Sequence, residues 1–146
     1  MERKSKILIG ETSLFAQDCA RALQNSGCLV TLCEKNGNSI ISALSGAYYD
    51  AVVAELFMQG ADGSDVLEHI SQFEEKPIAL ILLNSDDYKL QQQAMSAGAD
   101  YCLVCPADPN SVAKRIMRLL MWKKSRVQPA VNSQSAELVI SETLCK

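Results

Sequence analysis

Near the middle of the chain the sequence reads YDAVVAELFMQGADG, residues 49–63. Its first part is an apolar run of strand length that ends in a carboxylate, Glu55. Its second part is a loop that contains two glycines, Gly60 and Gly63. A buried strand that runs directly into a charged residue and then a loop is typical of α/β proteins, in which reaction and ligand sites form where the strands end.

The same kind of apolar run recurs along the chain and alternates with segments whose apolar residues have helical spacing. We expect strands at 6–10, 28–33, 51–55, 77–83 and 101–104. We expect helices at 13–25, 38–47, 62–73, 85–97 and 109–122. This alternation predicts an α/β fold: a doubly wound, five-stranded parallel sheet of the flavodoxin-like order 2-1-3-4-5, with helices on both faces.

In such a sheet the carboxyl ends of all the strands lie along one edge, beside the switch in strand order. The expected ends of the first and third strands are Glu11-Thr12 and Glu55. The fourth and fifth strands end at residues 82–84 and 105–106. We therefore expect any functional site of this domain to form among these residues.

Three motifs, in this order, resemble the receiver domain of bacterial response regulators. They are the first strand with Glu11 and Thr12, the third strand with Glu55, and the segment GADYCLVCP at 98–106. In that family the first strand ends in two aspartates, the third in the aspartate that accepts a phosphoryl group, and the fifth in lysine before a cis proline. The resemblance covers residues 4–122 and implies a module of phosphorelay-type signal transduction and transcription regulation, not an enzyme. It also implies a cis peptide bond between Cys105 and Pro106.

Each of the family's functional positions carries a different residue in this chain. Glu55 is the equivalent of the phosphoacceptor, and Glu11 and Thr12 are the equivalents of the acidic pocket. The equivalents of the switch residues are Leu82 for threonine or serine, Cys102 for the aromatic residue, and Cys105 for lysine. Neither leucine nor a neutral thiol can supply the lysine's charge or the hydroxyl's strong hydrogen bond.

These substitutions predict a degenerate receiver, or pseudo-receiver, that works without phosphorylation and has no catalytic or metal-binding residue. Magnesium needs a tight octahedron of hard oxygen ligands, so two longer glutamates and Thr12 predict weak or absent magnesium binding. We expect no other cofactor. Glu55 places its charge further from the backbone than aspartate does, and would act at most as a fixed imitation of a phosphorylated aspartate. The alternative is a functional phosphoacceptor receiver for a histidine kinase.

Composition places the chain among globular proteins. It has 146 residues, of which 48% are hydrophobic and 21% charged. No signal-peptide core and no apolar run of about 20 residues is present, so we expect a cytoplasmic location without membrane contact. In that compartment the six cysteines are expected to be reduced. Cys102 and Cys105 have the spacing of a redox pair, but residues three apart on a strand point to opposite faces.

The resemblance also implies partners. We expect a kinase or regulatory protein as partner, and a homodimer through the fourth helix, fifth strand and fifth helix. The raw material for that interface is Tyr88, Leu90, Gln91, Met95, Ile116, Leu119 and Leu120, of which some must belong to the core. Six basic residues between 114 and 126 could form a nucleic-acid patch, but a solvated helix face is the more common outcome.

The C-terminal part has a different composition. We divide the chain into a receiver-like domain at 1–124, a linker at 125–135, and the start of a second domain at 136–146. The last segment has an apolar stripe, with Leu138 and Leu144, that cannot bury itself in so short a piece. This arrangement is similar to that of sporulation-initiation response regulators, and it implies that DNA is contacted only through a missing C-terminal domain.

Overall fold

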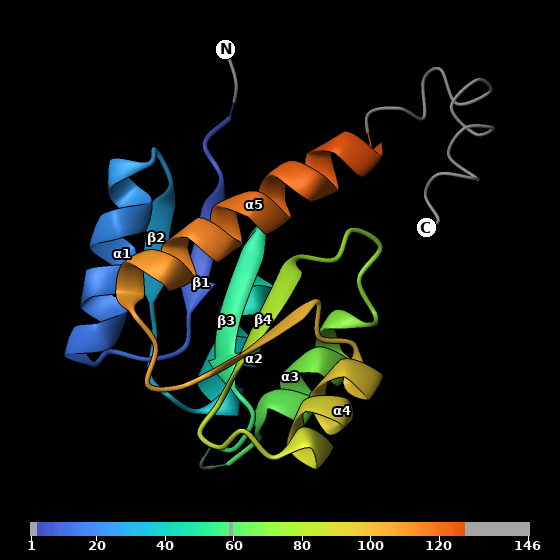
Figure 1. The fold of residues 1–146 in the computed structure, drawn as a ribbon. Helices are drawn as coiled ribbons and strands as arrows, with labels where there is room; N and C mark the ends of the chain where they lie inside the picture. The colour runs from blue at the N-terminus through green and yellow to red at the C-terminus, as the bar shows by residue number, and fades with distance from the viewer. Residues whose placement is uncertain (1–2, 59, 128–146) are drawn as a thin grey trace, which may run out of the picture.

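The structure is a computed structural model, and it describes residues 3–58 and 60–127. Its strands are β1 (Lys6–Ile9), β2 (Leu29–Leu32), β3 (Ala51–Glu55), β4 (Ile78–Leu83) and β5 (Tyr101–Val104). Its helices are α1 (Leu14–Asn25), α2 (Gly37–Gly46), α3 (Gly63–Ile70), α4 (Tyr88–Ala97) and α5 (Pro109–Val127). Strands and helices alternate as the sequence predicts (Figure 1).

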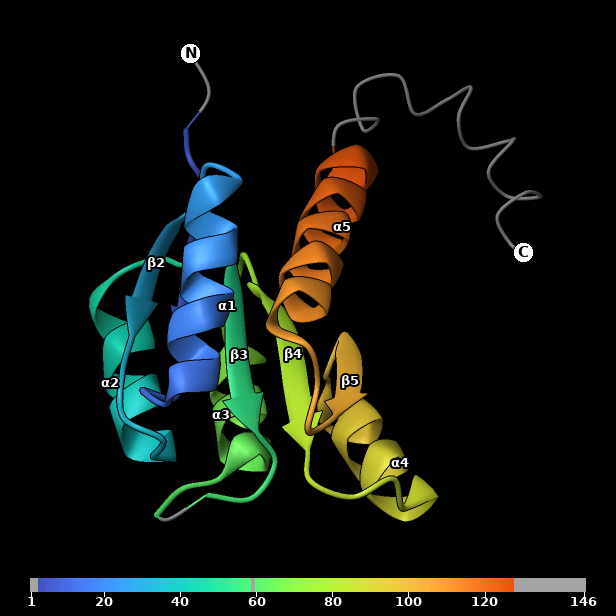
Figure 2. The same ribbon diagram turned by 60° about the vertical axis from the view of Figure 1, so that its left-hand side comes forward.

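The five strands form one parallel sheet in the order β2-β1-β3-β4-β5, which confirms the predicted topology. Helices α1 and α5 cover one face, and α2, α3 and α4 cover the other (Figures 1 and 2). The position of β4 between two layers of helices explains why its sequence is apolar throughout. Ile78, Leu80 and Leu82 pack under α1 and α5, whereas the alternate residues pack into the opposite core, so all six residues are buried.

The helix ends differ from the predicted ones by more than one residue at three places. α3 ends at Ile70 rather than at residue 73, and α4 begins at Tyr88 rather than at residue 85. The start of α4 is later because Asp87 is its N-cap, with a side chain that accepts a hydrogen bond from the Lys89 N–H. α5 continues to Val127 instead of ending at Trp122, so it includes the first three residues of the predicted linker. The rest of that linker and the segment 136–146 lie outside the described residues.

Part of the predicted dimer face belongs to the core. Ile116 and Leu120 are buried between α5 and the sheet, so they cannot contact a second subunit while the domain stays folded. Tyr88 and Met95 on α4 are exposed. Within the described part of the chain, no helix has the length and apolar character needed to cross a membrane.

Candidate functional site

The carboxyl ends of the strands meet at one edge of the sheet, as expected. The Gly10 N–H donates to the Val53 carbonyl oxygen at 2.8 Å, and the Cys105 N–H donates to the Leu83 carbonyl oxygen at 2.7 Å. These bonds continue the sheet pairing past the ends of β1 and β5. Gly10 has no room for a side chain, because a Cβ there would overlap the side chain of Ile40. The backbone therefore places Glu11, Glu55 and Cys105 around a common edge.

Glu55, the half-buried last residue of β3, forms an ion pair. The Lys35 Nζ donates a hydrogen bond to the Glu55 Oε2 at 3.2 Å. The Glu55 side chain is 23% exposed and that of Lys35 is 47% exposed, so water screens the pair in part. A cation is thus present beside the phosphoacceptor position, but it comes from the loop after β2 and not from β5.

The loop that carries Lys35 is attached to the loop that follows Glu55. The Gly37 N–H donates to the Ala61 carbonyl oxygen at 3.0 Å, and a Cβ on Gly37 would overlap that carbonyl group. Asn36 caps α2 by accepting a hydrogen bond from the Asn38 N–H at 2.7 Å. The close approach of these two loops keeps Lys35 near the end of β3.

The acidic-pocket equivalents lie in the turn between β1 and α1. The half-buried Glu11 accepts a hydrogen bond from the Ser13 hydroxyl, and the Ser13 Oγ in turn accepts one from the Ala16 N–H as the N-cap of α1. Thr12 is exposed. The edge therefore carries the carboxylates of Glu11 and Glu55, and a lysine is bound to one of them.

The expected switch equivalents lie on β4 and at β5. β3 and β4 pair with Glu55 opposite Leu82, and Leu82 is buried in the core under α1 and α5. Cys105 packs on that same core and Cys102 on the opposite one, which confirms that the two thiols do not face each other. All cysteines of the described residues are free thiols. The Cys105–Pro106 peptide bond is cis, as the resemblance implies.

Cys105 carries no charge to place beside the two carboxylates. Burial raises the pKa of the Cys105 thiol above its usual value, and the negative charges of Glu55 and Glu11 raise it further, while Lys35 acts in the opposite direction. The thiol is therefore neutral at pH 7. The same result shows that Cys105, Glu55, Glu11 and Lys35 are brought together in space. We call these four residues the carboxyl-end pole.

The carboxyl-end pole offers a metal ion the carboxylates of Glu11 and Glu55. Among residues 3–58 and 60–127, no three histidine, cysteine, aspartate or glutamate side chains are grouped to hold a metal ion. The Oε2 atom of Glu55 accepts a hydrogen bond from the Lys35 ammonium group. Magnesium requires several hard oxygens in near-octahedral geometry, and this pole offers two carboxylates and a competing positive charge.

Lys35 was not predicted from the sequence. The signal for it is indirect: a charged stretch, Glu34-Lys35-Asn36, directly follows a strand that lies beside the first strand. Sequence spacing alone does not show that this loop reaches the end of β3.

The chain belongs to the response regulator receiver domain family, whose model matches residues 7–117. It is 30% identical over 86 residues to the transcriptional regulatory protein ResD of Bacillus subtilis, a match that covers 59% of this chain and 35% of ResD. It is 25% identical over 142 residues to the DNA-binding transcriptional regulator NtrC of Salmonella typhimurium, covering 95% and 30% of the two chains. The chain thus spans about a third of the length of these relatives.

Solved structures show the same fold. The chemotaxis response regulator CheY4 of Vibrio cholerae superposes with a TM-score of 0.70 at 22% identity, over 80% of this chain and 98% of that one.

Proposed function

We propose that this protein is a pseudo-receiver: a two-component receiver domain that transmits a signal through protein contacts without phosphorylation of Glu55. The ion pair between Lys35 and Glu55 is the observation that carries the proposal. Phosphoryl transfer to a carboxylate needs a free oxygen and a divalent cation that neutralises the phosphoryl oxygens. Here an ammonium group of the same chain binds the carboxylate.

The buried side chains around the pole support the same proposal. A receiver switch draws the hydroxyl on the fourth strand toward the phosphoryl group, and an aromatic residue on the fifth strand then turns inward. Leu82 has no hydroxyl, and Cys102 has no ring to turn. A phosphoryl group on Glu55 would therefore lack both the group that senses it and the group that moves.

The output of the module is proposed to be transcription regulation in the cytoplasm, through a DNA-binding part that follows the receiver. The names of the relatives ResD and NtrC, both transcriptional regulators, support this output. The composition of residues 125–146 supports an affiliation with sporulation-initiation regulators. We further propose that contacts with a kinase or regulatory protein, and self-association through the exposed part of α4, set the activity of the output.

Incubation with a small-molecule phosphodonor and magnesium tests the central point. We expect the intact mass of the protein to stay unchanged, because Glu55 is paired with Lys35 and the pole lacks a magnesium cage. A receiver with the family's aspartate, run in parallel, verifies that the phosphodonor is active. A mass increase of one phosphoryl group that is lost in Glu55→Gln would overturn the proposal in favour of a functional phosphoacceptor for a histidine kinase.

Calorimetric titration with magnesium is the companion measurement. We expect no saturable heat and no change in the melting temperature, since Lys35 competes with the cation for Glu55. Tight stoichiometric binding that stabilises the fold would contradict the mismatch between this pole and magnesium.

A further inference from the structure

The opposite edge of the sheet, where the strands begin, carries a pocket of about 660 Å³. Its walls come from the segment before β1, the turn before β3, the loop before β4, and the last turns of α5. The residues that matter for its chemistry are Arg3, Tyr48, Asp50, Leu120, Trp122 and Lys123. We call these six residues the amino-end pole.

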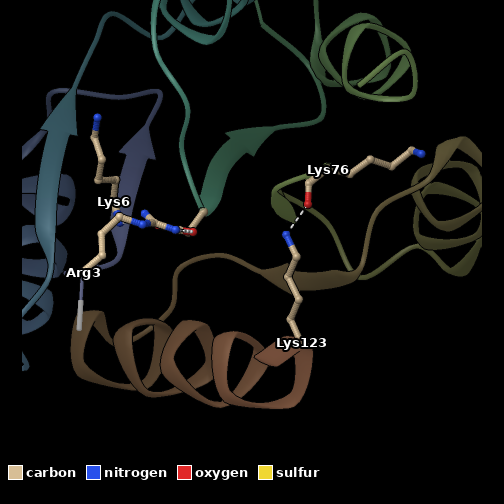
Figure 3. A network of polar contacts seen from close by, with 5 residues as sticks. Arg3, Lys6, Lys76 and Lys123 are labelled. Carbon is tan, nitrogen blue, oxygen red and sulfur yellow. Dashed lines mark hydrogen bonds and ion pairs between the residues drawn. The ribbon is translucent and has the colours of Figure 1, made fainter. Parts of the chain in front are cut away.

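Polar contacts hold the walls of this pocket in place (Figure 3). The two terminal nitrogens of Arg3 donate to the two carboxylate oxygens of Asp50 at 3.0 and 3.2 Å, and the Lys6 N–H donates to Asp50 at 2.8 Å. On the other wall the Lys123 ammonium donates to the Lys76 carbonyl oxygen, which ties α5 to the loop before β4. The pocket is therefore preorganised, which lowers the entropy that binding costs.

The pole combines the three residue types that most often dominate the energetics of protein interfaces. Arginine, tyrosine and tryptophan are enriched at the centres of such interfaces. Here the Arg3 guanidinium lies 5.8 Å from the centroid of the Tyr48 ring. Tyr48 is 37% exposed, Trp122 is 50% exposed, and Leu120 is buried. Two partly exposed aromatic rings in a concave, preorganised pocket are suited to an apolar polypeptide segment.

The chain itself has such a segment a short distance beyond α5 in the sequence. Trp122 precedes the end of α5 at Val127 by about 8 Å of helix. Residues 136–146 combine an apolar group, Leu138, Ile140 and Leu144, with two acids, Glu137 and Glu142. The nine residues from Val127 to Ala136 can span up to about 30 Å, enough to return to the pocket. Covalent connection makes the local concentration of this segment high.

The charges of the pocket and the apolar side chains of residues 136–146 favour these residues as its occupant. The pocket is lined by the cations Arg3, Lys76, Lys123 and Lys124 and by the acids Asp50, Glu74 and Glu75. Asp50 is neutralised by Arg3, which leaves a small positive excess for Glu137 and Glu142. The apolar side chains of Leu138, Ile140 and Leu144 gain stability when they pack on another surface and leave water.

We propose that the amino-end pole is the docking site for residues 136–146 of the same chain, with Trp122 and Tyr48 as its apolar anchors. The contact couples the position of whatever follows α5 to the edge of the receiver that lies farthest from Glu55. It does not depend on whether Glu55 is phosphorylated, so it can fail or hold independently of the pseudo-receiver function.

Trp122 is the only tryptophan of the chain and reports on the pocket directly. We expect Ile140→Asp in the full chain to at least double the acrylamide quenching of Trp122 fluorescence and to shift its emission to the red. Val131→Asp, which puts the same charge into the preceding stretch, is the matched control and is expected to leave both unchanged. Equal quenching in wild type and both variants would overturn the proposal. Protection of Trp122 that appears only as protein concentration rises would also overturn it, because the occupant would be a second copy.

A second measurement follows the same contact through Cys145 in residues 136–146. Cys145 lies in the proposed segment, so docking should slow its alkylation by iodoacetamide, followed by peptide mass spectrometry. We expect Trp122→Ala to accelerate alkylation of Cys145 severalfold, whereas Met121→Ala, at an exposed neighbour that does not line the pocket, leaves it at the wild-type rate. Equal rates in the two variants would contradict docking at Trp122.

Discussion

The two poles of the sheet both use a carboxylate at an end of β3, but they hold it differently. Asp50, just before β3, accepts two hydrogen bonds from the Arg3 guanidinium and one from a backbone N–H, and its side chain is 14% exposed. Glu55, at the other end, has one hydrogen bond from Lys35 and is 23% exposed. Charge-assisted bidentate pairs are stronger and more specific in geometry than single, partly solvated ones.

This difference separates a carboxylate that stabilises the fold, Asp50, from a carboxylate at the functional end of the sheet, Glu55. In the receiver family the chemistry belongs to the carboxyl ends of the strands, yet in this chain the stronger ion pair lies at the amino ends. We infer that Asp50 contributes to the stability of the fold and that Glu55 contributes little. The predictions below test this contrast, from the largest expected effect to the smallest.

The largest effect is expected where the two loops of the carboxyl-end pole touch. Gly37→Ala should lower the free energy of unfolding by about 2–3 kcal/mol, because the new Cβ overlaps the Ala61 carbonyl group and backbone must move. Gly46→Ala, at the other end of α2, has no atom within 4 Å of its Cβ and should stabilise by about 0.5–1 kcal/mol. Urea unfolding measures both. Equal effects of the two substitutions would mean that the loops are not in close contact.

At the amino-end pole, Asp50→Asn should cost about 1–3 kcal/mol, because it leaves the Arg3 guanidinium without its bidentate partner. Asp18→Asn is the matched control: its exposed pair with Arg21 in α1 is expected to contribute less than about 0.5 kcal/mol. Urea unfolding at pH 7 compares the two variants. A smaller loss for Asp50→Asn than for Asp18→Asn would reverse our assignment of Asp50.

The same pair of variants has a defined pH dependence. Burial alone raises the pKa of Asp50, but the hydrogen bonds from Arg3 and the Lys6 N–H, with the Arg3 charge, outweigh it and lower the pKa below its usual value. A carboxyl with a lowered pKa in the folded state contributes stability above its unfolded pKa of about 3.9, and loses it as pH falls through the folded pKa. The difference between wild type and Asp50→Asn should therefore be full at pH 6 and shrink below about pH 4.

The smallest effect is expected at Glu55. Glu55→Gln and Glu55→Asp should leave self-association and DNA binding of the full-length protein within about 0.5 kcal/mol of wild type, because Leu82 and Cys102 provide no switch. Lys35→Met, which removes the other member of the ion pair, should behave in the same way. Analytical ultracentrifugation and a DNA titration measure the two properties. A tenfold change, which is about 1.4 kcal/mol, would show that Glu55 is an active switch element.

The order of strands and helices was predictable from the sequence. A buried parallel sheet requires apolar runs, and the length and spacing of these runs can be read from the sequence alone. β3 and β5 have the predicted ends, whereas α3, α4 and α5 do not. Helix ends depend on local caps and on packing. α4 begins at Tyr88 because Asp87 is its N-cap, and the apolar spacing did not show this. The spacing also did not show that α5 continues to Val127.

For the candidate site, the sequence predicted which residues stand at the strand ends. It did not predict which residues pair with them. Glu11, Glu55 and Cys105 lie near one another as expected, and β3–β4 pairing places Leu82 beside Glu55 as the alignment predicts. Lys35 was missed, because the contact depends on how two loops meet, and loop conformation has no periodic signal. Some of the interface candidates were expected to belong to the core, and the structure shows that Ile116 and Leu120 do. Helical spacing alone does not show which face of α5 meets the sheet.

The sequence by itself determined the receiver fold, the strand order and which residues stand at the strand ends, because these follow from hydrophobic periodicity and from residue identity. Only the tertiary structure decided which charges pair. It brought Lys35 to Glu55 and Arg3 to Asp50 across 20 and 47 residues of chain. It also brought Tyr48 and Trp122 to one pocket. Such contacts join residues distant in sequence, so they arise from the packing of whole elements and leave no local pattern.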